Sequence, residues 1–373
     1  MARKQFLSFL LIFSLLISCA SALAEADDDD DWDDNVDDAW EMEHPLHSGD
    51  YAYALLDDGT VEITSYGGAD TEIVIPDTLD GKPVTAIGER AFYYSLSLTS
   101  VTIPDSVTHI SQKAFSCCFQ LTSITLPSGL TAIESGTFDL CKSLTTIDIP
   151  DSVAAIADDA FIGCKALQSF TLSPNHPYFF LADDALCRTA DSTLLLYPNA
   201  REPRTYRIPD GITAISAYAF YDCDLLESVV VPDSVTQLPA RAFSGCSALA
   251  SVSLPDSLTE VGTAAFSGCS ALTGIRIPAA ITEIINHTFS GCTSLATLEI
   301  PDSVTKIGDY AFFGCTSLTS IAIPDSVTAI GNGAFSNCTA LTLTVTPDSY
   351  AAEYAKANNI PYTYPDANDW LNN

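Results

Sequence analysis

The sequence predicts a solenoid built from short parallel β-strands, because one phrase recurs at a fixed interval along the 373-residue chain. The phrase, I-P-D-S-V-T-x-I-x-x-x-A-F-x-G-C-x-x-L-x-x-I-x, has a period of 23 residues. A strict period of this size is typical of repeat arrays, in which each unit buries its apolar face against its neighbours. The phenylalanine of the phrase occurs at Phe92, Phe115, Phe138, Phe161, Phe220, Phe243, Phe266, Phe289, Phe312 and Phe335.

Each repeat contains a short strand that ends at a proline. In residues 98–104, Val101 and Ile103 alternate with Ser100 and Thr102, which is the period of a strand with one buried face. Proline cannot donate to a sheet ladder, so Pro104 closes the strand. Because the repeats run in one direction, we expect about ten such strands to form a curved parallel sheet.

The rest of the phrase predicts two turns and a core. Asp-Ser or Asp-Gly after the proline predicts a turn in which the aspartate bonds its own backbone. The segment from Ile307 to Phe312 and its equivalents predict a short helical turn with the phenylalanine inside. The leucine that precedes each strand, such as Leu98, is expected to complete the core.

The chain has twelve cysteines, and most of them follow the repeat. Nine lie three residues after the phenylalanine of the phrase, so they are expected to stack in one column. We interpret this column as free thiols that act as small buried apolar groups. Metal sites need clustered pairs such as C-x-x-C, and the sequence has none. Cys117 and Cys187 lie off the column and are the better candidates for reactive thiols.

Residues 1–24 predict an export signal. Arg3 and Lys4 precede an apolar run over residues 6–17, and residues 22–24 read Ala-Leu-Ala, a cleavage pattern. The apolar run is too short to span a membrane, and no second apolar segment follows. An alternative stays open, since residues 16–19 resemble a bacterial lipobox in which Cys19 would be lipidated. Both alternatives place the protein outside the cytoplasm.

An acidic segment follows the signal. Residues 25–43 carry twelve acidic side chains and no basic one, so residues 25–45 are predicted to form a disordered acidic stalk. The whole chain has a formal net charge of −33 and a pI near 4.1. Such a surface repels nucleic acid phosphates and anionic lipid headgroups, which argues against nucleic acid as a partner.

The repeats resemble leucine-rich repeats of the BspA-like type, which occur in secreted and surface proteins of host-associated microbes. The fold class expected is therefore a leucine-rich repeat solenoid, α/β but strand-dominated, with end caps. The predicted divisions are an N-terminal β cap (46–75), repeats (76–172), a hairpin insertion (173–207), repeats (208–347) and a C-terminal cap (348–373). The insertion is predicted because the step from Phe161 to Phe220 is 59 residues.

Candidate binding residues come from comparing the repeats with one another. In each strand two side chains are expected to face the concave side, which is the usual recognition surface of a solenoid. The first is almost always Ser or Thr. The second, two residues before the proline, varies, and we hypothesise that it contacts the ligand, with Arg207, Arg276 and Glu299 foremost. Its members are Thr102, Thr125, Asp148, Thr171, Arg207, Val230, Ser253, Arg276, Glu299 and Ala322.

Nothing in the sequence predicts catalysis, a cofactor or a metal. The five histidines are scattered, and no nucleophile motif or phosphate-binding loop is present. The favoured function is an exported, non-enzymatic, monomeric binding protein for a host or neighbouring-cell surface protein or glycan. The resemblance implies adhesion or host interaction. The alternative is a structural spacer of the cell envelope with no specific ligand.

Overall fold

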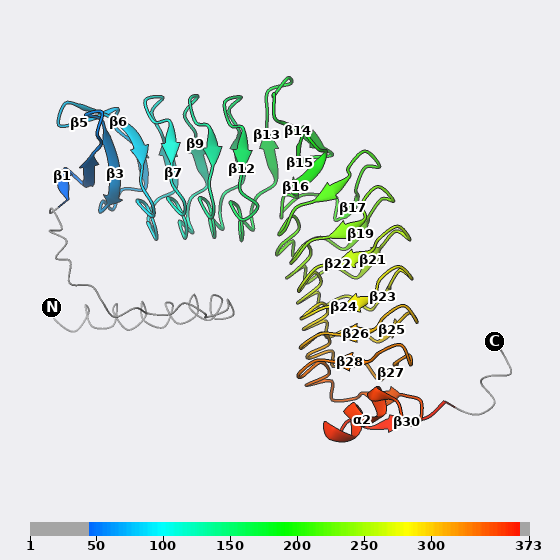
Figure 1. Ribbon diagram of the computed structural model, residues 1–373. Coiled ribbons are helices and arrows are strands. Elements are labelled where there is room, and N and C mark those ends of the chain that lie inside the picture. The colour runs from blue at the N-terminus through cyan, green and yellow to red at the C-terminus, as the bar shows by residue number, and fades with distance from the viewer. Residues whose placement is uncertain (1–44, 366–373) are drawn as a thin grey trace, which may run out of the picture. The chain divides into compact units, whose positions relative to one another are not determined.

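The computed structural model describes residues 45–365. The export signal (1–24), the lipidation candidate Cys19 and all of the stalk (25–45) except its last residue lie outside the described residues, as do residues 366–373 of the predicted cap. Within the described part, each repeat makes one coil of a strand-dominated solenoid (Figure 1). The fold class expected from the 23-residue period is confirmed.

The strand that ends at the proline is present in each repeat and pairs in parallel with its equivalents, as in Ser100↔Ser123 and Arg207↔Val230. These first strands form two arrays, one on each side of the predicted insertion. The first array contains β4 (Glu72–Val74), β7 (Ser100–Thr102), β9 (Ser123–Thr125), β11 (Thr146–Asp148) and β13 (Ser169–Thr171). The second contains β17 (Thr205–Arg207), β19 (Ser228–Val230), β21 (Ser251–Ser253), β23 (Gly274–Arg276), β25 (Thr297–Glu299), β27 (Ser320–Ala322) and β29 (Thr342–Thr344).

A second, two-residue strand follows the Asp-Ser turn in most repeats and also pairs in parallel, as in Lys306↔Ala329. Its buried residue is usually the isoleucine of the phrase, such as Ile307. The second strands are β8 (His109–Ile110), β10 (Ala132–Ile133), β12 (Ala155–Ile156), β18 (Ala214–Ile215), β20 (Gln237–Leu238), β22 (Glu260–Val261), β24 (Glu283–Ile284), β26 (Lys306–Ile307) and β28 (Ala329–Ile330).

The segment around each phenylalanine is a series of turns, so the prediction of a short helical turn is wrong. Nearly every repeat has a left-handed residue two positions before and two positions after the phenylalanine, as at His287 (φ 58°) and Gly291 (φ 73°). Left-handed backbone cannot continue a right-handed helix. Some N–H groups bond across repeats, as from Phe289 to the carbonyl of Ala311 (2.8 Å), and others close turns within the repeat, as from Ser290 to the carbonyl of His287 (3.1 Å).

The left-handed position after the phenylalanine explains the glycine in the phrase. At Gly291 a Cβ atom would meet only ordinary van der Waals contacts, so the backbone conformation alone selects glycine. We expect Gly291→Ala to lower the free energy of unfolding by about 1–2 kcal/mol. Gly211 is a matched control, because its φ is not left-handed and nothing lies within 4 Å of an added Cβ. Thermal unfolding that shifts equally for both alanine variants would contradict this assignment.

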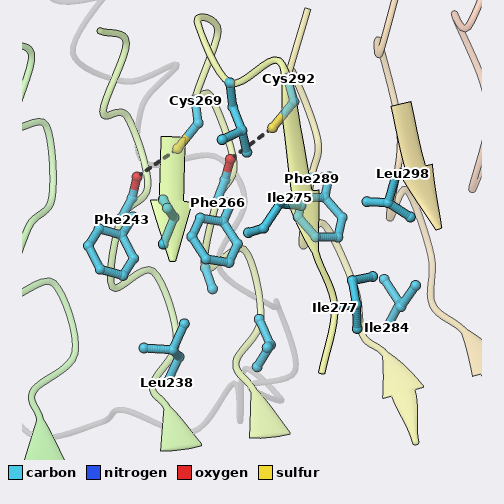
Figure 2. Close-up of a cluster of buried hydrophobic side chains, with 14 of the residues drawn as sticks. Leu238, Phe243, Phe266, Cys269, Ile275, Ile277, Ile284, Phe289, Cys292 and Leu298 are labelled. Atoms are coloured by element: carbon cyan, nitrogen blue, oxygen red, sulfur yellow. Dashed lines mark hydrogen bonds between the residues drawn. The ribbon is translucent and has the colours of Figure 1, made fainter. Parts of the chain in front are cut away.

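Aromatic rings and thiols form the core of both arrays. The rings of Phe243, Phe266 and Phe289 stack with centroids 5.5 and 5.7 Å apart (Figure 2). Each cysteine of the column donates its Sγ–H to the carbonyl of the phenylalanine one repeat earlier, as Cys269 does to Phe243 (3.1 Å). No disulfide forms among residues 45–365. Burial raises the pKa of the Cys292 thiol to about 12, which keeps it protonated.

The structure does not support Cys117 and Cys187 as reactive thiols. Both are buried, and burial raises the pKa of Cys187 to about 12. The last cysteine of the column, Cys338, is half-buried, and the neighbouring side chain of Cys315 lowers its pKa. Cys338 is therefore the accessible member of the column.

The two ends of the described solenoid close the aromatic stack. Tyr66 stacks on Phe92 at 5.3 Å, and Tyr354 meets Phe335 edge-on at 6.3 Å. Tyr66 ends an antiparallel meander of β1 (Leu46–Ser48), β2 (Tyr51–Leu55) and β3 (Val61–Tyr66), which pairs in parallel with β6 (Lys82–Ile87). Strand β5 (Thr78–Leu79) also pairs with β6. Tyr354 belongs to helix α2 (Tyr350–Ala357), which Ser349 caps and β30 (Tyr362–Thr363) follows.

The insertion is larger than the predicted hairpin. Three antiparallel strands form it, namely β14 (Phe179–Ala182), β15 (Ala185–Arg188) and β16 (Thr193–Leu196), and β16 then pairs in parallel with β18. The next residue, Tyr197, occupies the phenylalanine position and stacks on Phe220 at 5.2 Å. The predicted end at residue 207 is also wrong, since Thr205–Arg207 is the first strand of the second array. Tyrosine in place of phenylalanine concealed this extra repeat.

The insertion separates two buried clusters. Leu186 and Leu196 belong to the cluster of the first array, whereas Cys187, Leu194 and Tyr197 belong to the cluster of the second. Side chains alternate between the two faces of a strand, so a sheet with two apolar faces can contact two cores at once. The three-stranded insertion therefore joins the arrays by burying a different face against each.

The turn after each proline is held differently from the prediction. Asp105 accepts hydrogen bonds from the backbone N–H and hydroxyl of Ser128, one repeat later (both 2.9 Å), and not from its own turn. The serine that follows the aspartate ties successive turns together. Ser234, for example, donates to the carbonyl oxygens of Asp210 (3.0 Å) and Ile212 (2.6 Å). Like Asp105, Asp151 accepts a hydrogen bond from the hydroxyl of Ser173 (2.6 Å), so these aspartates bond residues outside their own turn.

Candidate binding face

The candidate face consists of the side chains that the first strands present to solvent, and we call it the strand face. Each three-residue strand buries its central residue, as Ile275 shows between Gly274 and Arg276. All ten residues of the predicted second column are exposed or half-buried: Thr102, Thr125, Asp148, Thr171, Arg207, Val230, Ser253, Arg276, Glu299 and Ala322. The period-two alternation in the sequence therefore located this column correctly.

The column extends one strand further at each end than the sequence suggested. Val74 lies opposite Thr102 in the parallel register, and Thr344 lies opposite Ala322. Residues 71–77 repeat the strand-proline-aspartate pattern, which could have revealed Val74. Thr344 was harder to find, because its step from Ala322 is 22 residues, one short of the period.

Two neighbouring hollows lie on the strand face of the second array. The first has a volume of about 600 Å³ and is lined by Arg207, Val230, Ser253 and Arg276 of the column, together with the turns that follow their strands. The second has a volume of about 880 Å³ and is lined by Arg276, Glu299, Ala322 and Thr344. Arg276 lines both hollows, so it lies where they meet.

The structure thus brings together six of the ten predicted residues, those from Arg207 to Ala322. The remaining four, Thr102, Thr125, Asp148 and Thr171, share one face of the first array but line neither hollow. Three of these four are threonine, so the column is also more uniform there. Three charged residues of the column, Arg207, Arg276 and Glu299, all line these two hollows.

The two arginines are paired with aspartates from the turns. Arg207 bonds Asp210 of its own repeat at 3.3 Å, and Arg276 bonds Asp256 of the preceding repeat at 2.6 Å. All four side chains are well exposed, and such pairs contribute about 0–1 kcal/mol. The pairs orient the guanidinium groups without burying them. Each arginine keeps further N–H donors for a ligand, because guanidinium carries five.

Two further features bear on the kind of site. Within residues 45–365, no three or more His, Cys, Asp or Glu side chains cluster as a metal centre would require. The single described helix, α2, is short, and nothing in the described range is a helix able to cross a bilayer. The strand face itself presents hydroxyl groups, as at Ser253, charged groups, as at Arg276 and Glu299, and an exposed apolar side chain at Val74.

Comparison with known proteins gives the same architecture. The family model for the BspA type leucine rich repeat region matches six copies over residues 71–181 and 213–342, well over half of the chain. A leucine rich cell surface protein from Faecalibacterium prausnitzii is 31% identical, with a TM-score of 0.51, covering 85% of this chain and 97% of that one.

More distant structures share the fold. A leucine-rich repeat protein from Eubacterium ventriosum is 24% identical, with a TM-score of 0.62, covering 81% of this chain and 95% of that one. The pneumococcal vaccine antigen PcpA is 16% identical, with a TM-score of 0.54, covering 87% and 99% respectively. The search of curated proteins gave no match. Because the family model matches well over half of the chain and the Faecalibacterium prausnitzii protein is 31% identical to it, the chain belongs to the BspA-type leucine-rich repeat proteins.

Proposed function

We propose that this chain is an exported, non-enzymatic binding protein that recognises a surface protein or glycan through the strand face of its second array. The similar protein from Faecalibacterium prausnitzii is described as a cell surface protein, which supports a location outside the cytoplasm. Adhesion or host interaction is the role that fits such a location.

One observation carries the proposal. The departures Arg207, Arg276 and Glu299 all line the two hollows. Strands form with Thr, Ser, Asp or Arg at this position, so the sheet itself does not require a particular side chain there. Departures such as Arg276 and Glu299 do not serve packing, because both side chains are exposed. Recognition on an exposed repeat surface is the function that such departures serve.

The test is a screen of the full chain against matrix proteins, mucins and glycans, beside the double variant Arg207→Ala/Arg276→Ala. We expect a saturable hit that the double variant weakens at least tenfold, because each arginine supplies charge-assisted donors to the ligand. The matched control is Lys82→Ala/Lys306→Ala, which removes the same charge from β6 and β26, away from both hollows.

The outcomes separate the two candidate functions. A hit that survives in the control and is lost in the double variant supports recognition by the strand face. A hit that the double variant keeps would place binding elsewhere, for instance on the insertion. The absence of any hit would favour the structural spacer of the cell envelope.

A further inference from the structure

The repeat that contains β23 combines three departures from the common phrase, and the three positions surround one hollow. Gly274 replaces the usual Ser or Thr of the first column, Arg276 is a cation, and Ala279 replaces the aspartate that follows the proline. All three line the larger hollow of about 880 Å³. The neighbouring repeats keep Ser251 and Asp256 at the equivalent positions. The three departures therefore coincide in space as well as in sequence.

Two of these changes determine the charge around the guanidinium. Arg276 bonds Asp256 and lies opposite Glu299 in the parallel register. Ala279 leaves out a third carboxylate, the one that would follow the proline of the same repeat. Arg276 uses Nη1 to bond Asp256 (2.6 Å), which leaves its other N–H groups for a ligand. A planar guanidinium pairs with a carboxylate through two parallel hydrogen bonds.

The third change uncovers a hydroxyl group. Gly274 has no side chain beside Thr297, and a Cβ there would lie 3.2 Å from the Oγ1 of Thr297. The glycine therefore leaves space next to that hydroxyl. Thr297 and Ser320 both line the hollow, next to the carboxylate of Glu299. Hydroxyl groups can donate hydrogen bonds to a polyhydroxylated ligand and accept them from it, whereas a carboxylate only accepts.

The lining favours a sugar over a protein partner. The exposed side chains of this hollow are hydroxyl-bearing, charged or small, and its larger apolar residues, such as Ile275 and Ile321, are buried. Protein interfaces depend on apolar or aromatic anchors in well-packed pockets, whereas this hollow offers hydrogen-bonding groups. Its volume lies in the range of small-molecule sites, about 300–1,000 Å³.

We propose that the hollow around Arg276 binds a sugar unit that carries one carboxylate, within a glycan. Arg276 bonds the carboxylate, while Glu299, Thr297 and Ser320 bond the ring hydroxyls. The net charge of −33 opposes a polyanion, so the ligand is a glycan with an isolated acidic sugar. This inference rests on the proposed function and names the ligand class of the same face.

The experiment measures binding of the full chain to sialyllactose, to a disaccharide containing glucuronic acid, and to neutral lactose by saturation-transfer NMR and calorimetry. The first two probes separate the two common sources of a sugar carboxylate. We expect at least one of them to bind at least tenfold more tightly than lactose, the effect of one charge-assisted pair. Equal binding of lactose, or binding of no acidic probe, would overturn the proposal.

The decisive variant restores the repeat's own consensus. Ala279→Asp places an acid where the neighbouring repeats carry Asp256 and Asp302, so it suits the fold. It also places a carboxylate beside Arg276, and we expect at least a tenfold loss of acidic-sugar binding. Thr102→Asp is the control, since it adds the same charge to the strand face of the first array, away from both hollows and between the uncharged neighbours Val74 and Thr125. Equal effects of the two variants would contradict the assignment.

The sugar assignment can fail while the proposed function of the strand face holds, and the variants distinguish the two cases. If a protein partner binds, loses affinity in Arg207→Ala/Arg276→Ala and ignores Ala279→Asp, the strand face is a recognition surface but the sugar assignment is wrong. If acidic sugars bind and Ala279→Asp removes them, both stand.

Discussion

Phe266→Ala is expected to lower the free energy of unfolding by about 3–5 kcal/mol, because it opens a cavity in the middle of the second array. The side chain of Phe266 is fully buried, and its ring stacks on Phe243 and Phe289 at 5.5 and 5.7 Å. Each repeat is stabilised mainly by its neighbours, so the loss acts on two interfaces. Urea denaturation followed by circular dichroism measures the effect.

Phe180 provides the control for this prediction. Phe180 lies on the edge strand β14 and is 36% exposed, so Phe180→Ala makes the same substitution at a less buried site. We expect Phe180→Ala to cost about 1 kcal/mol or less. A Phe266→Ala variant no less stable than Phe180→Ala would mean that the aromatic stack does not hold the array together.

The second large effect is a loss of stability at alkaline pH. Burial raises the pKa of Cys118, Cys187 and Cys292 to about 12, from an ordinary value of 9.0. Below pH 9 these thiols are protonated in both states and cost nothing. As the pH rises from 9 towards 12, the unfolded chain releases protons that the folded chain keeps, so folding becomes less favourable.

The magnitude follows from the pKa differences. At pH 10 each of the three thiols costs about 1.4 kcal/mol, or about 4 kcal/mol together. Urea midpoints at pH 8, 9 and 10 measure the loss. In Cys292→Ala one titrating thiol is gone, so the drop between pH 8 and 10 is expected to shrink by about 1.4 kcal/mol. An unchanged pH dependence in that variant would show that the column does not titrate in this way.

The sequence was sufficient for the fold because the repeat itself carries the information. The period placed Phe266, Cys269 and the first strands correctly, since each packs against its own equivalent in the next repeat. Interactions that break the period were not predictable in this way. Tyr197 takes the place of a phenylalanine. The segment that leads to it consists of three antiparallel strands, whereas the strands of the repeats pair in parallel.

The binding face was predicted in part, for a similar reason. Alternation along a strand determines which side chains face solvent, so the second column could be named from the sequence. The hollows could not, because they depend on which small residues adjoin Arg276 across neighbouring strands, as Gly274 and Ala279 do. Likewise, the pairing of Arg276 with Asp256 joins two repeats, and composition alone does not specify it.

The most direct test of the central claim, that the strand face of the second array is the binding surface, is a blocking experiment. In a Cys19→Ala/Cys338→Ala background the remaining thiols are all buried, so a cysteine introduced by Ser253→Cys can be labelled selectively with a bulky maleimide. We expect the label to abolish binding of the partner found in the screen, because Ser253 lines a hollow. Thr125→Cys, labelled at the same column position of the first array, is expected to bind normally. Full binding after labelling at residue 253 would contradict the account.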